Sequence, residues 1–151
     1  MIVKIKTKEG ATEPLYKTSG ASGCDLYALD NIMFKAGEIK LVETGIFLEI
    51  PEGFEAQIRT RSSMGLEGVI VLNSPGTIDS DYRGEIKVIL KNTNKFSYLV
   101  LKTRAIAQMV FQKVEKASFE HVKILEKTER NDGGFGSTNK WRLKGLLFLL
   151  E

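Results

Sequence analysis

Short runs in which apolar and polar residues alternate recur along almost the whole chain. Alternation is clearest at 2–6 and 85–91, and β-branched residues fill most of 69–72. A period of two is typical of strands that bury one face. The pattern predicts strands at 2–6, 25–28, 32–35, 38–42, 45–50, 54–60, 69–72, 85–90, 96–101, 106–114 and 119–124.

Turn-forming residues separate these runs, among them Gly10, Gly37 and Pro51-Glu52-Gly53. No long stretch has the period of an amphipathic helix, and 61–66 has room for only one or two helical turns. Many short strands at this spacing predict an all-β fold of the sandwich, barrel or jelly-roll kind. Such a fold has edge strands to cover, and association with further copies of the chain is one way to cover them.

Size and charge narrow the class of protein. With 151 residues, 42% of them hydrophobic, the chain suits one well-buried domain. The formal net charge of +3 is modest and the signs are interspersed, so we expect no nucleic-acid partner. The N-terminus lacks the apolar core of a signal peptide, and the apolar run 146–150 is too short to cross a bilayer. We therefore expect a cytoplasmic protein without a membrane partner.

Cysteine and histidine limit the metal chemistry. Cys24 is the single cysteine and His121 the single histidine, which excludes an internal disulfide and a thiolate–imidazole metal cluster. Any metal would be a hard, oxygen-bound ion such as Mg²⁺. We expect Cys24 to be a small packing residue, because no base is placed to activate it.

A stretch rich in polar and turn-forming residues, 73–84, lies between two predicted strands. We expect a hairpin loop, with Ile78 as its apolar anchor in the core. A carboxylate at Asp79 or Asp81 can orient or deprotonate a water, and the ring of Tyr82 offers a flat face to a sugar or base. The alternative is an ordinary aspartate-rich turn.

Two earlier segments are also candidate sites. The small residues of 19–24 allow a ligand or backbone to come close to Asp25, which otherwise makes a turn hydrogen bond. In 61–66, Arg61 and two serines favour a phosphate site at the start of a short helix, where serine is a preferred N-cap. A plain capped turn is the alternative for this segment.

Two later segments complete the candidates. Gln108 interrupts an apolar run at 104–111, so its amide needs a partner, either backbone or a ligand oxygen. In 130–138, glycines surround a lone phenylalanine without any strand or helix signal, which indicates a mobile arm. Such an arm can stack its ring on a base and direct glycine N–H groups at phosphates, or it can be a disordered tail.

Together and in this order, five segments resemble the five motifs of the homotrimeric dUTP diphosphatases (dUTPases). The segments are 21–26, 61–63, 73–84, 106–108 and 133–138. The resemblance implies a β jelly roll, the dUTPase-like β-clip, assembled as a homotrimer with active sites at the subunit junctions. It implies Mg²⁺-dependent hydrolysis of dUTP to dUMP and pyrophosphate, which keeps uracil out of DNA and supplies dUMP for thymidylate synthesis.

The resemblance also implies roles for single residues. Asp79 matches the catalytic aspartate, which activates a water for in-line attack on the α-phosphorus, and Tyr82 matches the tyrosine beneath the deoxyribose. The uracil pocket corresponds to Asn73, Thr77, Ile78 and Lys87. Phosphate contacts correspond to Arg61, Ser62, Ser63 and Gln108, and Asp25 matches a carboxylate that holds Mg²⁺ through water. The closing arm corresponds to Arg130, Phe135, Gly136, Ser137 and Thr138, with Phe135 over uracil.

This interpretation divides the chain into a jelly-roll domain at 1–128, a mobile active-site arm at 129–139 and an extension of unknown role at 140–151. Three departures from the family stand out, and one of them is this extension, which outruns the usual family end. Thr103-Arg104-Ala105 replaces a common Gly-Asp-Arg, so a salt bridge of those residues cannot be carried over. Asn131 and Asn139 replace glycines, and asparagine tolerates unusual backbone angles.

Three rival functions remain at this point. A dCTP deaminase, including its bifunctional form, shares the fold, but the pairing of Asp79 with Tyr82 and the complete arm favour dUTP hydrolysis. A nucleotide-binding trimer that signals without catalysis would lack the water-activating carboxylate. A structural jelly roll of the capsid type gives no reason for the glycine-rich arm.

Overall fold

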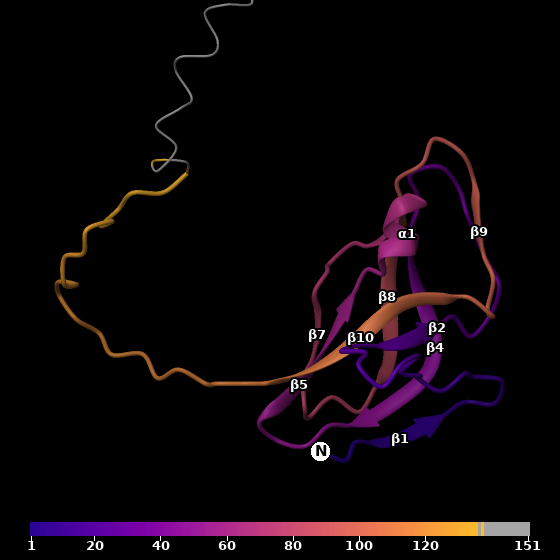
Figure 1. The fold of residues 1–151 in the computed structure, drawn as a ribbon, viewed down its shortest axis with the longest axis horizontal. Coiled ribbons are helices and arrows are strands. Elements are labelled where there is room, and N and C mark those ends of the chain that lie inside the picture. Colours follow the sequence, from indigo (N-terminus) through magenta and orange to yellow (C-terminus); the bar gives the residue numbers. More distant parts are fainter. Residues whose placement is uncertain (136, 138–151) are drawn as a thin grey trace, which may run out of the picture. The chain divides into compact units, whose positions relative to one another are not determined.

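The computed structural model describes residues 1–135 and 137. In them, ten strands form three antiparallel sheets, and there is one short helix (Figure 1). The first sheet has the order β1-β4-β8-β6, which are Lys4–Thr7, Ile39–Glu49, Glu85–Asn92 and Val69–Val71. The second has the order β2-β10-β5-β7, which are Cys24–Tyr27, Ala105–Lys113, Phe54–Arg59 and Gly76–Ile78. A smaller sheet pairs β3 (Ile32–Phe34) with β9 (Tyr98–Val100), and helix α1 is Ser62–Leu66.

The two four-stranded sheets share one apolar core. Alternate residues of β4 and β8, such as Ile46 and Leu90, are fully buried, and so are Leu26, Ala56 and Ile106 of the second sheet. This is the burial that period-two alternation produces when two sheets pack face to face. The predicted all-β jelly roll is confirmed. No helix in the described part of the chain is long and apolar enough to cross a membrane.

Two predicted strands are in fact one. The runs 38–42 and 45–50 join as β4, and the register against β8 shifts between Glu43 and Ile46. Gly45 lies at this shift with a φ of +71°, and a Cβ there would stand 2.7 Å from the Cβ of Ala11. Glycine is needed at this position because of both the backbone angle and the space.

Two further predictions about strands were wrong. The run 119–124 forms no strand, because its apolar side chains find no partner strand in the described residues: Phe119 and Ile124 are 92% and 86% exposed. Strand β7 was missed, because it has only three residues and directly follows Pro75. The short helix expected within 61–66 is confirmed as α1.

The chain separates into two compact units, Met1–Lys116 and the residues from Ala117 onward. All strands and the helix named above belong to the first unit. The described residues of the second unit form turns closed by short-range hydrogen bonds, such as Gly133 N–H to the carbonyl of Arg130 at 2.9 Å.

Candidate active site

The loop 73–84 connects the two main sheets. Strands β6 and β8 on either side of it pair in the first sheet, as a hairpin should, with Val71 opposite Leu90. Strand β7, inside the loop, instead pairs with β5 of the second sheet, with Ile58 opposite Gly76. A loop anchored to both sheets holds its side chains in a fixed place between them.

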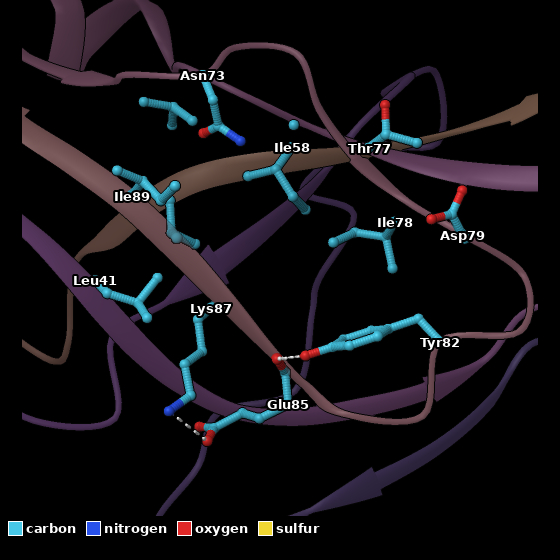
Figure 2. Close-up of a pocket in the computed structure, with 13 residues that line it drawn as sticks. Leu41, Ile58, Asn73, Thr77, Ile78, Asp79, Tyr82, Glu85, Lys87 and Ile89 are labelled. Atoms are coloured by element: carbon cyan, nitrogen blue, oxygen red, sulfur yellow. Dashed lines mark hydrogen bonds and ion pairs between the residues drawn. The ribbon is translucent and has the colours of Figure 1, made fainter.

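A pocket of about 290 Å³ opens at this loop (Figure 2). Its apolar wall comes from β4, β5, β6 and β8 and includes Leu41, Ile58, Val71 and Ile89. Its lining also contains all six residues predicted for the nucleoside end and the catalytic group: Asn73, Thr77, Ile78, Asp79, Tyr82 and Lys87. In Figure 2, Asn73 and Thr77 lie on one side, Tyr82 and Lys87 on the other, and Ile58 between them.

Tyr82 is fixed by the backbone of its own loop. Its hydroxyl donates to the carbonyl of Glu85 at 3.0 Å, and its N–H donates to the carbonyl of Asp79 at 3.2 Å. The ring covers Gly84, where a Cβ would stand 2.3 Å from the tyrosine oxygen. Asp79 and the ring of Tyr82 are therefore held in one rigid turn.

Asp79 lies at the border of two cavities. Its carboxylate is exposed at the edge of the pocket (Figure 2). The same residue also lines a second cavity of about 520 Å³, which Asp81, Arg83 and Glu55 share. Asp81 does not line the first pocket. An exposed carboxylate at the mouth of an apolar pocket can reach a water beside a bound ligand.

A second group of predicted residues gathers where β2, β10 and α1 meet. Asp25 of β2 lies opposite Gln108 of β10. The Nε of Arg61 is 2.9 Å from Oδ1 of Asp25, and its Nη1 donates to the carbonyl of Ala105 at 3.1 Å. Gln108 donates from Nε2 to the carbonyl of Thr60 at 3.2 Å, so its predicted backbone partner is present. The structure therefore brings Asp25, Arg61 and Gln108 together.

The two serines begin helix α1, but not as its N-cap. The N-cap is Arg61, in extended conformation and without a side-chain cap hydrogen bond, so the prediction of a serine cap was wrong. Ser62 is exposed and Ser63 is half-buried. The contact of these two hydroxyls with phosphate stays a prediction.

Asp25 has an unusual second oxygen. Its side chain is only 10% exposed, and Oδ1 is engaged by Arg61. Oδ2 is buried and has no hydrogen-bond partner, the only such side-chain nitrogen or oxygen found in residues 1–135 and 137. Buried acceptors are almost always satisfied, so this oxygen calls for a donor from outside the chain.

Thr60 links the two groups of residues, and no sequence pattern indicated it. Its N–H donates to Oγ of Ser74 at 3.4 Å, and its Oγ1 accepts from the N–H of Val71 at 2.9 Å. Its carbonyl accepts from Gln108. A threonine at a strand end carries no motif, so only the fold shows this connection.

Glu85 was also missed, although it lines the pocket and is 8% exposed. Its carboxylate accepts from the N–H of Gly45 at 2.8 Å and from Lys8 at 2.8 Å, and Lys87 lies 3.8 Å away. The hydrogen bond to Glu85 raises the pKa of Lys8, and the hydrogen bond to Glu43 raises the pKa of Lys87. The long-range pairing of β1, β4 and β8 creates this cluster, which a sequence pattern cannot show.

The predicted arm lies in the second compact unit. Arg130 donates from Nε to the carbonyl of Gly133 at 2.8 Å. Asn131 has a φ of +45°, in the left-handed region that asparagine tolerates, and exposed Phe135 has a φ of +48°. Ser137 donates its N–H to the carbonyl of Gly134. Gly136, Thr138 and the extension 140–151 lie outside the described residues.

Comparison with known proteins shows the family of this chain. The family model of the dUTPases matches residues 9–139. A deoxyuridine 5'-triphosphate nucleotidohydrolase of Hydrogenobaculum sp. is 54% identical, covering 91% of this chain and 96% of the relative. The protein of the same name from Thermoanaerobacter sp. is 46% identical, covering 91% and 97% of the two chains.

Solved structures share the fold. The dUTPase of Staphylococcus bacteriophage 80alpha with dUpNHpp has a TM-score of 0.84 at 21% identity, covering 90% of this chain and 97% of its own. A mutant dUTPase of the S. aureus phage phi11, whose description names a structural Mg(II) ion, has a TM-score of 0.78 at 17% identity, covering 84% and 100%. By its family match and its relatives, this chain belongs to the dUTPase family.

Proposed function

We propose that this protein hydrolyses dUTP to dUMP and pyrophosphate, with Asp79 as the catalytic residue that activates the attacking water. The observation that carries the proposal is the pocket at loop 73–84, which holds Asp79 at its edge beside an apolar wall and a fixed tyrosine ring. Membership of the dUTPase family and the names of the relatives support the substrate.

The nucleoside end of the substrate fits the pocket. The amide of Asn73 and the backbone of β7 can hydrogen-bond the edge of a uracil ring, while Ile58 and Ile89 provide an apolar wall beside it. A Cβ at Gly76 would stand 2.9 Å from Nδ2 of Asn73, so glycine there leaves room for the amide. The ring of Tyr82 would lie under the deoxyribose, where a ribose 2′-hydroxyl collides.

The phosphates would extend from Asp79 toward cationic and hydroxyl groups. Arg61, Ser62, Ser63 and Gln108 are the residues we assign to phosphate contacts. Arg61 is already oriented by Asp25 and the carbonyl of Ala105, so little reorganisation is needed when an anion binds. Charge compensation matters because repulsion between an anionic base and a triphosphate would otherwise oppose attack on the α-phosphorus.

The residues present also fit Mg²⁺ as cofactor. The described residues contain no group of three or more His, Cys, Asp or Glu side chains arranged for a metal, so the ion would be held mainly by substrate phosphates and water. The unpartnered Oδ2 of Asp25 fits a hydrogen bond from a metal-bound water. When bound, Mg²⁺ would neutralise phosphate charge.

We assign the last part of the site to the segment 129–139, with Arg130, Phe135, Gly136, Ser137 and Thr138 closing over the nucleotide. Phe135 would stack on uracil, and its fully exposed ring supports a partner outside its own turn. The jelly-roll domain in this proposal is 1–128. The role of 140–151 stays open.

We further propose that the protein is a homotrimer whose active sites are shared between subunits. We place it in the cytoplasm. Asp79 and Tyr82 are exposed in the single chain, and Tyr82 is 46% exposed. A second copy that supplies phosphate contacts and a third that supplies the arm would shield both from bulk water, which strengthens the electrostatic interactions that catalysis needs.

The test is pyrophosphate release from dUTP, UTP, dTTP and dCTP, each with and without Mg²⁺. We expect pyrophosphate to be released from dUTP and not from the other three nucleotides, and only when Mg²⁺ is present. Ammonia release from dCTP, measured in a parallel assay, would instead identify a deaminase. Sedimentation of the active protein measures the trimer separately, and a fully active monomer would contradict shared sites.

A further inference from the structure

Helix α1 is held at both ends by two consecutive residues, Arg104, which directly precedes β10, and Ala105, which begins it. At its N-terminal end, Arg61 donates to the carbonyl of Ala105 at 3.1 Å. At its C-terminal end, the C-cap residue Glu67 forms an ion pair with Nη2 of Arg104. Both tethers lead to the start of β10, where residues 104 and 105 are neighbours.

The tether at Glu67 is a closed group of three side chains. The hydroxyl of Tyr98 donates to one carboxylate oxygen of Glu67, and Arg104 donates to the other. Arg104 also donates from Nη1 to the tyrosine oxygen at 2.8 Å. The backbone carbonyl of Glu67 accepts from Nδ2 of Asn94 at 2.8 Å, so main chain and side chain are both fixed.

At neutral pH, the protonation states of Glu67 and Tyr98 favour these hydrogen bonds. The hydrogen bond from Arg104, followed by that from Tyr98, lowers the pKa of Glu67. Burial, followed by the hydrogen bond to Glu67, raises the pKa of Tyr98. The carboxylate therefore stays ionised while the phenol keeps the proton that it donates.

Helix α1 needs such tethers because it has little stability of its own. It has five residues, no side-chain cap, no acidic residue in its first turn and no basic residue in its last. Met64 is its one buried residue. Helices this short are not stable in isolation, so contacts with the rest of the fold decide where this one lies.

We propose that Arg104 and Glu67 are positioning residues, which hold helix α1 so that Ser62 and Ser63 meet the substrate's phosphates. This inference rests on the proposed function. Exposed ion pairs contribute little to global stability, and these two side chains are 35% and 40% exposed, so the effect is expected on the helix rather than on the fold.

The experiment compares ligands that do and do not need the helix. Arg104→Gln, Glu67→Gln and the double variant are assayed for dUTP hydrolysis, and a nonhydrolysable dUTP analogue and deoxyuridine are used as competitive inhibitors. We expect the inhibition constant of the analogue to rise about 10- to 100-fold, the scale of a small misplacement of binding groups. That of deoxyuridine should stay unchanged, because the nucleoside contacts lie in loop 73–84. The double variant should resemble either single one, because the two residues act as one unit.

The matched control is Lys4→Gln, which removes another exposed ion pair, with Glu49 at 2.7 Å in the pairing of β1 with β4. If Arg104→Gln does not fold, Tyr98→Phe and Glu67→Gln decide the matter, with the melting temperature of each variant as a check. The inference is overturned if the inhibition constant of the analogue is unchanged, or if that of deoxyuridine rises equally. Failure of the unmodified protein to hydrolyse dUTP overturns the proposed function instead.

Discussion

The hydroxyl of Tyr82 donates a hydrogen bond to the backbone carbonyl of Glu85, three residues further along the chain, at 3.0 Å. The bond pulls the ring across Gly84 and fixes it relative to Asp79, whose carbonyl accepts the N–H of Tyr82. The group assigned to water activation and the ring assigned to the sugar thus belong to one hydrogen-bonded turn.

Gly84→Ala should displace the ring of Tyr82. A Cβ at this position would stand 2.3 Å from the tyrosine oxygen and 2.4 Å from Cζ, a collision that the fixed ring cannot avoid without breaking its hydrogen bond. We expect kcat/KM for dUTP to fall by about 100-fold, the cost of misplacing a reacting group by about 1 Å. Steady-state kinetics measure the loss, and a melting curve checks that the fold persists. Wild-type kcat/KM would show that the ring's position is unimportant.

Asp79→Asn should abolish most turnover without abolishing binding. An amide keeps the shape of the side chain but cannot accept a proton from water, and loss of a general base costs about 10²- to 10⁴-fold in rate. Asp81→Asn is the matched control, because Asp81 lines only the second cavity. We expect near-normal kcat for Asp81→Asn and normal affinity for a dUTP analogue in Asp79→Asn. Equal kcat losses in the two variants would contradict the choice of Asp79.

Much of the fold follows from local pattern. Alternation in 85–91 and the turn residues around it correctly predicted β8, and the loop before it was correctly placed as a hairpin. Strand β7 was not predicted from the sequence, because its three residues gain their strand geometry from pairing with β5, which is distant in sequence. The run 119–124 shows the opposite error: an apolar pattern without a partner strand in the described residues forms no strand.

Some residues of the candidate site could also be predicted from the sequence, and others could not. Residues within one loop, such as Asn73, Asp79 and Tyr82, share a pocket as expected from their proximity in the sequence. Thr60 and Glu85 were missed, because their contacts come from strand pairing across the fold. What each predicted residue does to a nucleotide stays a prediction, because it depends on ligands and further subunits.

Acid should destabilise the protein partly through Glu43. Its hydrogen bond to Lys87, at 2.7 Å, is the largest cause of a pKa that is lower in the folded chain than in the unfolded one. A carboxyl group with a lowered folded pKa contributes stability above its unfolded value of about 4.3, and this contribution is lost as pH falls through the folded value.

Urea unfolding between pH 7 and pH 3 measures this contribution. Glu43→Gln should make the free energy of unfolding depend less on pH, with the difference from wild type shrinking as pH falls below the unfolded pKa. The side chain is exposed, so the change should be small. Glu120→Gln, in the second compact unit, controls for the loss of any one carboxylate. Parallel curves for wild type and Glu43→Gln would refute the assignment.

Asp25→Asn should weaken the response of the enzyme to Mg²⁺. The substitution places an NH₂ group or a neutral oxygen where the buried Oδ2 is assigned to accept from a metal-bound water, and it removes the charge that pairs with Arg61. We expect the Mg²⁺ concentration for half-maximal dUTP hydrolysis to rise, because one hydrogen bond to the hydrated ion is lost. Titration of activity with Mg²⁺ at saturating dUTP measures the shift. Asp30→Asn, a surface substitution outside the site, should leave the titration unchanged, and the same midpoint in wild type and Asp25→Asn would mean that the orphaned oxygen serves another donor.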